Sequence, residues 1–383
     1  MLNAINYALN GADAKEYSND LLIDEALYKI LPKNYKKSLS GIFGSIYEAN
    51  CWHLNEFTLR TVRRLSKPYE GRIIYPLIFI KNLMVERIAD RIYKRSKTAF
   101  LRFRITSDFN PLKYNDIFLH NIPPMVQIIF DLLYHKNKLR KVHIFEDGVD
   151  SYNTQYQAEY FSNTYKDLEI YTHLYEPDLV VFDNPVSKIA LLPKLSRDNA
   201  DTIKCLNGVY GYEYEDISKR GIEFILLDQY LERCVKNNDK KQKYVYKLKI
   251  ELYEAAIDIL KQKLLFKIHP MSLTQGSRNS YKFENAVIDP KFNRYPLEIV
   301  LLNSKQRPGL ISISSTASFT PYIAFKDELP EYNLIILDRF FKLGEIDARF
   351  SNVERFIDKL GEKHNFYRPS TMAEYKEILH SLG

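Results

Sequence analysis

Three short motifs of chemically active residues each follow a stretch with the pattern of a β-strand. The first motif is Glu146-Asp147-Gly148, directly after residues 142–145. Two adjacent carboxylates beside a glycine that permits a tight turn can present one acid to a ligand. Such a carboxylate can act as general base on a substrate hydroxyl when burial or a neighbour adjusts its pKa. An acidic turn that only ends a strand has the same sequence, so both interpretations stay open.

The second motif is His269-Pro270, after residues 264–268. Pro270 cannot extend a strand ladder and restricts the backbone of His269. The imidazole would then leave the strand end in one direction, where it could protonate a departing phosphate or stabilise its charge. Lys267 should face the same side of the strand and add positive charge. The alternative is a purely structural histidine.

The third motif is Ser314-Ser315-Thr316, which precedes a helical pattern over residues 317–325. Hydroxyls beside exposed backbone N–H groups at a helix N-terminus form an anion site, although a simple N-cap would look alike. Glu298 opens another predicted helix. Its carboxylate could accept hydrogen bonds from ribose hydroxyls, or it could merely favour the helix dipole.

Strand patterns alternate with helical patterns along most of the chain, which predicts an α/β fold with parallel sheets covered on both faces. Ligands of such sheets bind at the carboxyl ends of the strands, where the three motifs stand. Clear helical periodicity covers residues 126–134 and 246–263. The candidate strands are residues 20–23, 71–80, 116–120, 141–145, 179–182, 223–227, 264–268, 309–313 and 333–337.

The pattern divides into two Rossmann-like domains with a cleft between them. A polar stretch rich in turn formers, residues 193–221, contains the predicted boundary near residue 206. We therefore expect an acceptor-side domain over 1–205, a donor-binding domain over 206–365 and a C-terminal helical segment over 366–383. An amphipathic helix over 2–9 stands where a first strand would be usual, so that strand is either missing or replaced by another segment.

Composition narrows the classes of partner. The net charge is +7 over 383 residues, and no nucleic-acid-binding motif accompanies it. The basic run 236–249 is either a solvated surface or a contact for an anionic membrane face. Three scattered cysteines, Cys51, Cys205 and Cys234, predict neither a disulfide framework nor a zinc site, which fits a reducing cytoplasm. No apolar run reaches the ~18 residues of a membrane span, and no secretory signal layout opens the chain.

Several common enzyme classes lack their motifs. The chain has no GxxxxGK[ST] loop of nucleoside triphosphatases, no GxGxxG of dinucleotide enzymes and no GxSxG elbow of serine hydrolases. No Asp-x-Asp occurs either, which argues against a divalent metal that clamps a diphosphate. An acid in one half and a histidine plus hydroxyls in the other instead favour a transferase for a nucleotide sugar.

The three motifs resemble, in order and context, three motifs of bacterial sialyltransferases: paired acid-Gly, His-Pro and Ser-Ser/Thr. The similarity is greatest to glycosyltransferase family 52, which includes lipooligosaccharide sialyltransferases, and more distant to bacterial polysialyltransferases. It extends from about Tyr114 to Phe325 and includes the segment 186–193. The resemblance implies a GT-B fold, a CMP-sialic acid donor, no required metal or other cofactor, and inversion at the anomeric carbon.

The resemblance also implies residue roles. His269 would be the general acid or electrostatic partner at the departing CMP phosphate. Ser314 and Ser315 would bind that phosphate. Glu146 maps to the base of the polysialyltransferases, and Asp228 is the nearest match to the base of the lipooligosaccharide enzymes. The remaining expected site residues are Asp147 beside the base, Lys267, Pro270, Glu298 and Thr316 at the donor, and Gly148 in the turn.

Three functions remain open. The first is transfer of sialic acid to a hydroxyl of a cell-surface glycan, in lipooligosaccharide or capsule. The second is the same chemistry with another nucleotide sugar, and the third is a non-catalytic partner in polysaccharide assembly. Family analogy adds a possible homodimer, peripheral contact with the inner membrane face, and a closing helix, residues 371–382, that packs across the first domain.

Overall fold

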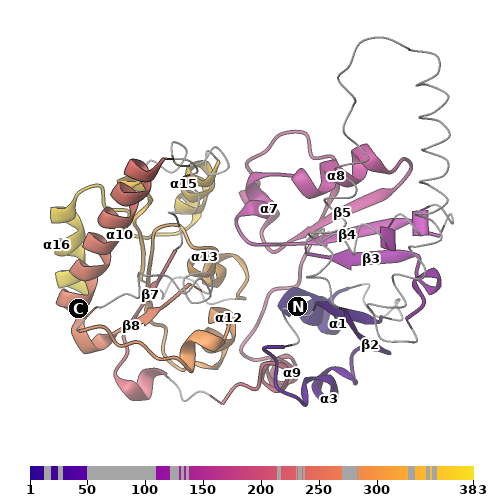
Figure 1. Cartoon of the computed structure of the whole chain (residues 1–383), viewed down its shortest axis with the longest axis horizontal. Helices are drawn as coiled ribbons and strands as arrows, with labels where there is room; N and C mark the ends of the chain where they lie inside the picture. The colour runs from indigo at the N-terminus through magenta and orange to yellow at the C-terminus, as the bar shows by residue number, and fades with distance from the viewer. Residues whose placement is uncertain are drawn as a thin grey trace, which may run out of the picture. The chain divides into compact units, whose positions relative to one another are not determined.

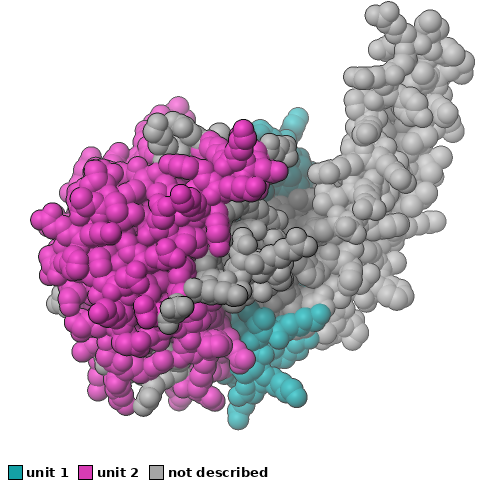
Figure 2. All heavy atoms as spheres, turned by 60° about the vertical axis from the view of Figure 1, so that its left-hand side comes forward, with its two compact units in different colours: residues 1–145, 156–173, 186–189 teal, residues 146–155, 174–185, 190–383 magenta. Residues whose placement is uncertain are grey.

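The computed structural model describes residues 1–12, 19–24, 29–49, 109–120, 129–130, 133–134, 138–213, 217–229, 231, 235, 238–269, 283, 285–326, 333–341, 346 and 352–383 (Figure 1). The chain forms two compact units, coloured separately in Figure 2. Unit 1 comprises Met1–Phe145, Tyr156–His173 and Val186–Ile189, and unit 2 comprises Glu146–Gln155, Leu174–Pro185 and Ala190–Gly383. The units therefore alternate along the chain, and the predicted boundary near residue 206 stays a prediction.

Unit 1 carries a two-stranded parallel sheet and most of a four-stranded sheet. The small sheet pairs β1 (Leu21–Asp24) with β2 (Ile46–Ala49). The larger sheet runs β3-β4-β5-β6, and its β3–β4 and β4–β5 pairs are parallel. Its strands are β3 (Asp116–Leu119), β4 (Lys141–Phe145), β5 (Glu169–Leu174) and β6 (Lys188–Leu191). The helical elements are α1 (Leu2–Asn10), α3 (Tyr35–Leu39), α8 (Tyr156–Thr164) and the 3-10 turn η2 (Pro111–Lys113).

Strand β4 is buried on both faces. Its alternate side chains point to opposite sides of the sheet, and each set packs in a different group of residues. Val142 and Ile144 belong to a buried apolar cluster that also contains Phe130 and Phe161. On the opposite face, His143 and Phe145 belong to a group of aromatic side chains whose rings contact one another. The members of that group are Tyr7 of α1, Phe118, His143, Phe145, Tyr171 and His173.

Unit 2 surrounds a parallel sheet in the order β10-β9-β7-β8. Its strands are β7 (Phe224–Leu227), β8 (Leu264–Lys267), β9 (Gly309–Ser312) and β10 (Leu334–Ile336). Its α-helices are α7 (Asp150–Asn153), α9 (Ala200–Tyr210), α10 (Asp239–Leu260), α12 (Leu297–Asn303), α13 (Thr316–Ile323), α15 (Val353–Lys363) and α16 (Met372–Leu382). The 3-10 turns are η3 (Pro177–Leu179), η4 (Ile217–Arg220), η6 (Lys261–Lys263), η7 (Phe292–Arg294) and η8 (Asp338–Phe340).

The order of this sheet reverses at β7. Strand β8, the next in the chain, lies on one side of β7, and β9 lies on the other side. All residues of β7, β9 and β10 are buried, as expected for a parallel sheet with both faces covered. In Figure 1, α10 and α16 lie on one side of β7 and β8, with α12 and α13 on the other. A reversal of this kind opens a crevice at the carboxyl ends of the two diverging strands.

The longest helix, α10, is positioned by its cap and its apolar stripe. The Asn238 side chain accepts a hydrogen bond from the Lys241 N–H, which satisfies one of the first-turn donors. Buried residues recur at helical spacing and pack toward β7 and β8, while α16 packs on α10 as well. The stripe includes one lysine. Its members are Val245, Lys249, Leu252, Tyr253, Ala256 and Leu260.

Most strand predictions on described residues are confirmed to within one or two residues, from 20–23 (β1) to 333–337 (β10). The helix over 2–9 is confirmed as α1. The helix over 246–263 is confirmed in part, since α10 begins earlier and η6 replaces its end. The strand over 71–80 lies outside the described residues. The helix over 126–134 is helical at its described positions: 129, 130, 133 and 134.

The predicted strand over 179–182 is wrong. Pro177 starts the 3-10 turn η3, and the chain then continues without strand pairing. Leu179 and Val181 are buried all the same, because Lys359 of α15 donates to the carbonyl of Val180 and holds the segment against that helix. The apolar residues that imitate a strand therefore serve a loop packed on α15. The strands β2, β5 and β6 were not predicted as such.

No helix in the described ranges is long and apolar enough to span a membrane.

The closing helix α16 begins after Thr371, whose side chain accepts from the Glu374 N–H, and it packs on α10 of the same unit. Its packing across the first predicted domain stays a prediction.

Candidate functional site

Two consecutive residues at the end of β7 connect the three strand ends at the reversal point of the unit 2 sheet. Asp228 reaches toward β8, where its Oδ2 accepts the backbone N–H of His269 at 3.2 Å. Gln229 reaches toward β9, where its side chain bonds Ser314. The central strand thus holds the predicted histidine on one side and the predicted serine motif on the other. The strand order brings these residues together, although they are far apart in sequence.

Asp228 is a buried carboxylate with a buried ionic partner. The Lys249 Nζ lies 3.4 Å from Asp228 Oδ1, and neither side chain is exposed. Lys249 also donates to the Gln229 carbonyl at 3.0 Å. A buried pair of this kind is tolerated only with further hydrogen bonds, and loss of one member would leave an uncompensated charge. The pair therefore holds the end of β7 to α10, and Lys249 is not part of a basic surface.

Gln229 makes a double hydrogen bond to one residue. Its Oε1 accepts the Ser314 backbone N–H at 2.6 Å, and its Nε2 donates to the Ser314 Oγ at 3.1 Å. The next turn is fixed by hydroxyls: the Ser315 N–H donates to Ser312 Oγ at 3.3 Å, and Ser312 pairs with Ser318 at 2.8 Å. Ser315 is the N-cap of α13 without a side-chain capping bond. The Ser314-Ser315 turn is therefore held rigidly, while the Ser315 hydroxyl is not used by the helix.

Glu146 is buried, and one of its oxygens accepts two hydrogen bonds. The Tyr152 hydroxyl and the Tyr175 N–H both donate to Glu146 Oε2. Burial raises the pKa of Glu146 to about 7, although both hydrogen bonds and the Lys194 ammonium act to lower it. A carboxyl group that titrates near neutral pH is suited to general base catalysis. Asp147, next in the chain, is exposed, and its N–H donates to Ser151 Oγ at 2.7 Å.

The turn after Glu146 packs directly on the start of α13. Gly148 has φ +69°, and a Cβ added there would lie 2.2 Å from Thr316 Cγ2. The Val149 N–H points to Thr316 Oγ1 at 3.4 Å. The paired-acid motif and the serine motif are therefore neighbours inside unit 2, and glycine is required by both its backbone angle and the lack of space.

The Lys267 ammonium group donates hydrogen bonds to backbone carbonyl groups. Its Nζ donates to Tyr295 O at 2.8 Å and contacts Phe292 O at 3.4 Å. Burial lowers the pKa of Lys267 to about 8, opposed by the nearby Glu298 carboxylate. Glu298 in turn accepts from Thr320 Oγ1 at 3.2 Å, which joins α12 to α13. The described contacts of Lys267 therefore support the loop before α12, and that of Glu298 supports the packing of α12 on α13. Pro270 lies outside the described residues.

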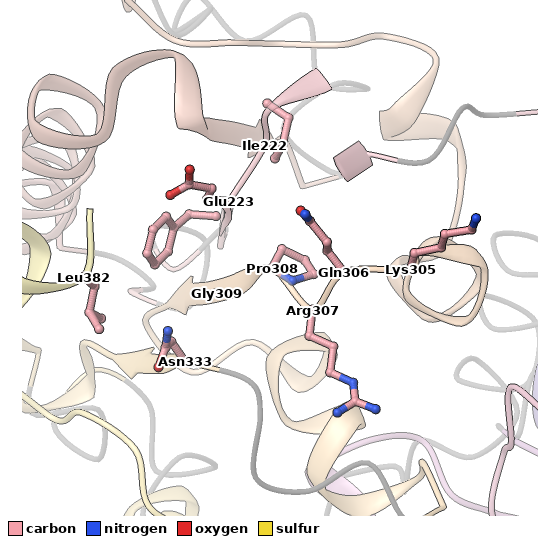
Figure 3. Close-up of a pocket in the computed structure, with 10 residues that line it drawn as sticks. Ile222, Glu223, Lys305, Gln306, Arg307, Pro308, Gly309, Asn333 and Leu382 are labelled. Atoms are coloured by element: carbon pink, nitrogen blue, oxygen red, sulfur yellow. The ribbon is translucent and has the colours of Figure 1, made fainter. Parts of the chain in front are cut away.

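A depression of about 470 Å³ lies at the opposite ends of the unit 2 strands from Asp228 and Ser314 (Figure 3). Its walls are residues that stand just before β7, β9 and β10, such as Glu223, Pro308 and Asn333, together with Lys305 and Arg307. Those are amino ends of strands, whereas ligands of open parallel sheets bind at carboxyl ends. In the described part of the chain, no group of three or more His, Cys, Asp or Glu residues could hold a metal ion.

The fold defines the class of the protein: an α/β protein with parallel sheets, compatible with a Rossmann-like fold. No protein-family model, curated protein or solved structure matches the chain. The sialyltransferase resemblance therefore stays a prediction.

Sequence reasoning missed three residues of this site: Gln229, Lys249 and Tyr152. Gln229 stands directly after the strand end that it serves, so its position was a usable signal. Lys249 falls on the buried stripe of α10, but a lysine within a basic run gives the impression of a surface residue. Tyr152 is six residues from Glu146, and only the short turn between them makes the contact possible.

Proposed function

We propose that this protein is a glycosyltransferase that moves a sugar from a nucleotide donor to a hydroxyl of a glycan. Its most specific form is metal-independent, inverting transfer of sialic acid from CMP-sialic acid to lipooligosaccharide or capsule, on a GT-B fold. One observation carries the proposal. Asp228 and Gln229 hold His269 and Ser314 at the reversal point of a parallel sheet, and the Glu146–Gly148 turn packs on the adjoining Thr316.

In this proposal the acceptor hydroxyl loses its proton to Glu146 as its oxygen attacks the anomeric carbon. The bond between that carbon and the phosphate oxygen breaks, and CMP leaves. His269 offsets or protonates the departing phosphate, and the Ser314 and Ser315 hydroxyls donate to it. Positioned acids and bases of this kind contribute about 10²- to 10⁴-fold in rate.

The contacts favour Glu146 over Asp228 as base. Both carboxylate oxygens of Asp228 already have partners, Lys249 on one and the His269 N–H on the other. Protonation of Asp228 during turnover would break a buried ion pair, which is costly. Glu146, with a pKa of about 7, can gain and lose a proton near neutral pH. Asp228 is then a positioning residue for His269.

The hydrogen bonds of the serine turn support a donor with a single phosphate. Diphosphates are commonly held by several successive backbone N–H groups. Here the Ser314 N–H is occupied by Gln229 and the Ser315 N–H by Ser312. The hydroxyls and the first turn of α13 remain, a smaller donor set that suits CMP better than UDP or GDP.

Two alternatives keep the same fold: another nucleotide sugar as donor, or a non-catalytic partner in polysaccharide assembly. We place the protein in the cytoplasm with its glycan acceptor, with peripheral contact to the inner membrane face and a homodimer as further proposals. With Lys249 buried, the lysines of α10 that could contact a membrane are the exposed ones, such as Lys240 and Lys247.

The test is a calorimetric titration of the whole chain with CMP, and with UDP and GDP as controls. The variant is Ser314→Ala/Ser315→Ala, and a matched control is Ser40→Ala/Ser381→Ala at two exposed serines. We expect selective CMP binding that the first variant loses and the control keeps. Tighter binding of UDP or GDP would overturn the CMP assignment, and no binding of any nucleotide would favour the non-catalytic partner.

A further inference from the structure

The Gln229 side chain fixes which atoms of Ser314 can meet a ligand. The Ser314 backbone N–H is a donor, so the atom 2.6 Å from it must be the oxygen of the Gln229 amide. The amide nitrogen is then the atom that faces the Ser314 Oγ at 3.1 Å. This nitrogen has hydrogens and no accepting lone pair. The orientation of the amide therefore follows from the chemistry of its two contacts.

The Ser314 hydroxyl is consequently an acceptor toward Gln229 and a donor in another direction. A serine hydroxyl has one hydrogen, and Gln229 Nε2 cannot accept it. The hydroxyl hydrogen is thus kept for a different partner, while its oxygen is held in place. Ser314 is only 6% exposed, so few orientations remain for that hydrogen. A hydroxyl whose one hydrogen is directed away from Gln229 is suited to donate to an anion.

Gln229 is itself held on both sides of its backbone. Its N–H lies 3.1 Å from the Tyr253 hydroxyl, and its carbonyl accepts from Lys249 Nζ at 3.0 Å. Tyr253 and Lys249 are both buried residues of α10, one turn apart. The longest helix of unit 2 therefore fixes the residue that orients Ser314. Donors held in place before the ligand arrives stabilise charge without reorganisation.

We propose that Gln229 is a positioning residue that presents the Ser314 hydroxyl as a hydrogen-bond donor to a bound phosphate. The inference rests on the proposed function, since that function places the phosphate at Ser314. It adds a residue to the site and a reason for an amide at position 229. A carboxylate there would keep the bond to the Ser314 N–H, but its second oxygen would accept the hydroxyl hydrogen and repel the phosphate.

The experiment compares CMP and inorganic phosphate binding to wild type, Gln229→Glu and Gln229→Met. The control is Gln306→Glu, which makes the same change of charge. Gln306 is an exposed glutamine near the amino ends of the strands (Figure 3). We expect Gln229→Glu to weaken CMP binding about 10- to 100-fold at pH 8, the range for loss of a hydrogen bond to a charged group. Gln306→Glu should change it less than about twofold, as expected for a remote surface substitution.

Two further measurements separate orientation from a merely structural role. Protonation of the new carboxyl restores an O–H donor toward Ser314, so Gln229→Glu should recover affinity relative to wild type as the pH falls from 8 toward the ordinary glutamate pKa of about 4.3. The effect of the neutral Gln229→Met change on affinity should also shrink to within about threefold in a Ser314→Ala background, because coupled residues are not additive. Gln229→Met keeps the volume, and we expect it to weaken binding without pH-dependent recovery.

The outcomes distinguish this inference from the proposed function. Phosphate binding that depends on Gln229 as described, without CMP selectivity, would support the inference and overturn the CMP assignment. CMP binding by a folded Gln229→Glu protein that equals wild type at pH 8 would overturn the inference and leave the proposed function standing. Absence of CMP and phosphate binding in the wild type would overturn both.

Discussion

The two four-stranded sheets differ in strand order, and the difference decides where polar groups gather. In the sheet β3-β4-β5-β6 the strands lie side by side in the order of the chain. Three buried polar side chains lie within its described strands: His143 and His173 bond each other at 2.9 Å among aromatic neighbours, and Thr172 bonds Ser187 at 2.7 Å. The buried Glu146 follows the end of β4. In the sheet β10-β9-β7-β8 the order reverses, and buried polar groups gather at the ends of two neighbouring strands: Asp228 after β7, and Ser312 and Ser314 at β9.

The reversal is the place at which open α/β sheets bind their ligands. When successive crossovers leave a strand in opposite directions, the loops after the two strands separate and their side chains face a crevice. Each sheet also has a histidine just beyond a strand, His120 after β3 and His269 after β8, so the two can be compared directly.

The largest expected effect concerns these two histidines. We expect His269→Ala to lower kcat by about 10²- to 10⁴-fold with the fold intact, because it removes a positioned acid at the departing phosphate. His120→Ala should change kcat by less than about threefold, since its Nε2 contacts the Met1 amino group at 3.3 Å within unit 1. Steady-state kinetics with circular dichroism would check both. Equal losses in the two variants would remove the distinction between the sheets.

A smaller effect, of about 3 kcal/mol, is expected from Glu146→Gln. The folded-state pKa of Glu146, about 7, exceeds its ordinary value of 4.5, so the folded protein holds this proton more tightly than the unfolded chain. The stabilisation is complete below pH 4.5 and is lost as the pH rises through 7. The variant stays neutral, and its free energy of unfolding should exceed that of wild type by about 3 kcal/mol at pH 8.5.

Denaturant unfolding of Glu146→Gln and wild type at pH 5 and pH 8.5 would measure this difference, which should be much smaller at pH 5. The same variant should lose activity, whereas wild-type kcat/KM should rise through pH 7 as the base ionises. A variant that is less stable than wild type at pH 8.5 would show that burial of the Glu146 carboxylate does not destabilise the folded protein.

The smallest expected effect compares two glycines of unit 2 with the same backbone angle. Gly148 and Gly221 both have φ +69°, but a Cβ at Gly148 would meet Thr316, whereas a Cβ at Gly221 meets nothing within 4 Å. Gly221→Ala should therefore cost about 1 to 2 kcal/mol for the left-handed backbone alone. Gly148→Ala should cost about 1 to 3 kcal/mol more, because the added atom is overpacked.

Chemical denaturation of both glycine variants gives that difference directly. Thr316→Ser removes the nearest carbon, so Gly148→Ala/Thr316→Ser should recover part of the loss. Equal costs at the two glycines would indicate that the turn after Glu146 does not press on α13.

Most of the fold on described residues was predictable, because it depends on local pattern. Largely apolar runs followed by turn residues mark β4, β7, β8 and β9, and helical periodicity marks α1 and α10. The same local logic failed at residues 179–182, where burial comes from contacts with α15 far along the chain. It also missed β5, whose sequence EIYTHL mixes polar and apolar side chains because each face meets a different environment.

The sequence by itself determined which residues follow the strands: the acids at Glu146 and Asp228, the histidine at position 269 and the serines after β9. Only the tertiary structure decided which of these meet. Strand order arises from crossover direction and from packing between segments distant in the chain, which no local pattern contains. The same packing turned Lys249 inward to Asp228 and directed the Gln229 amide at Ser314, because buried charges and amides are stable only where partners from other elements complete their hydrogen bonds.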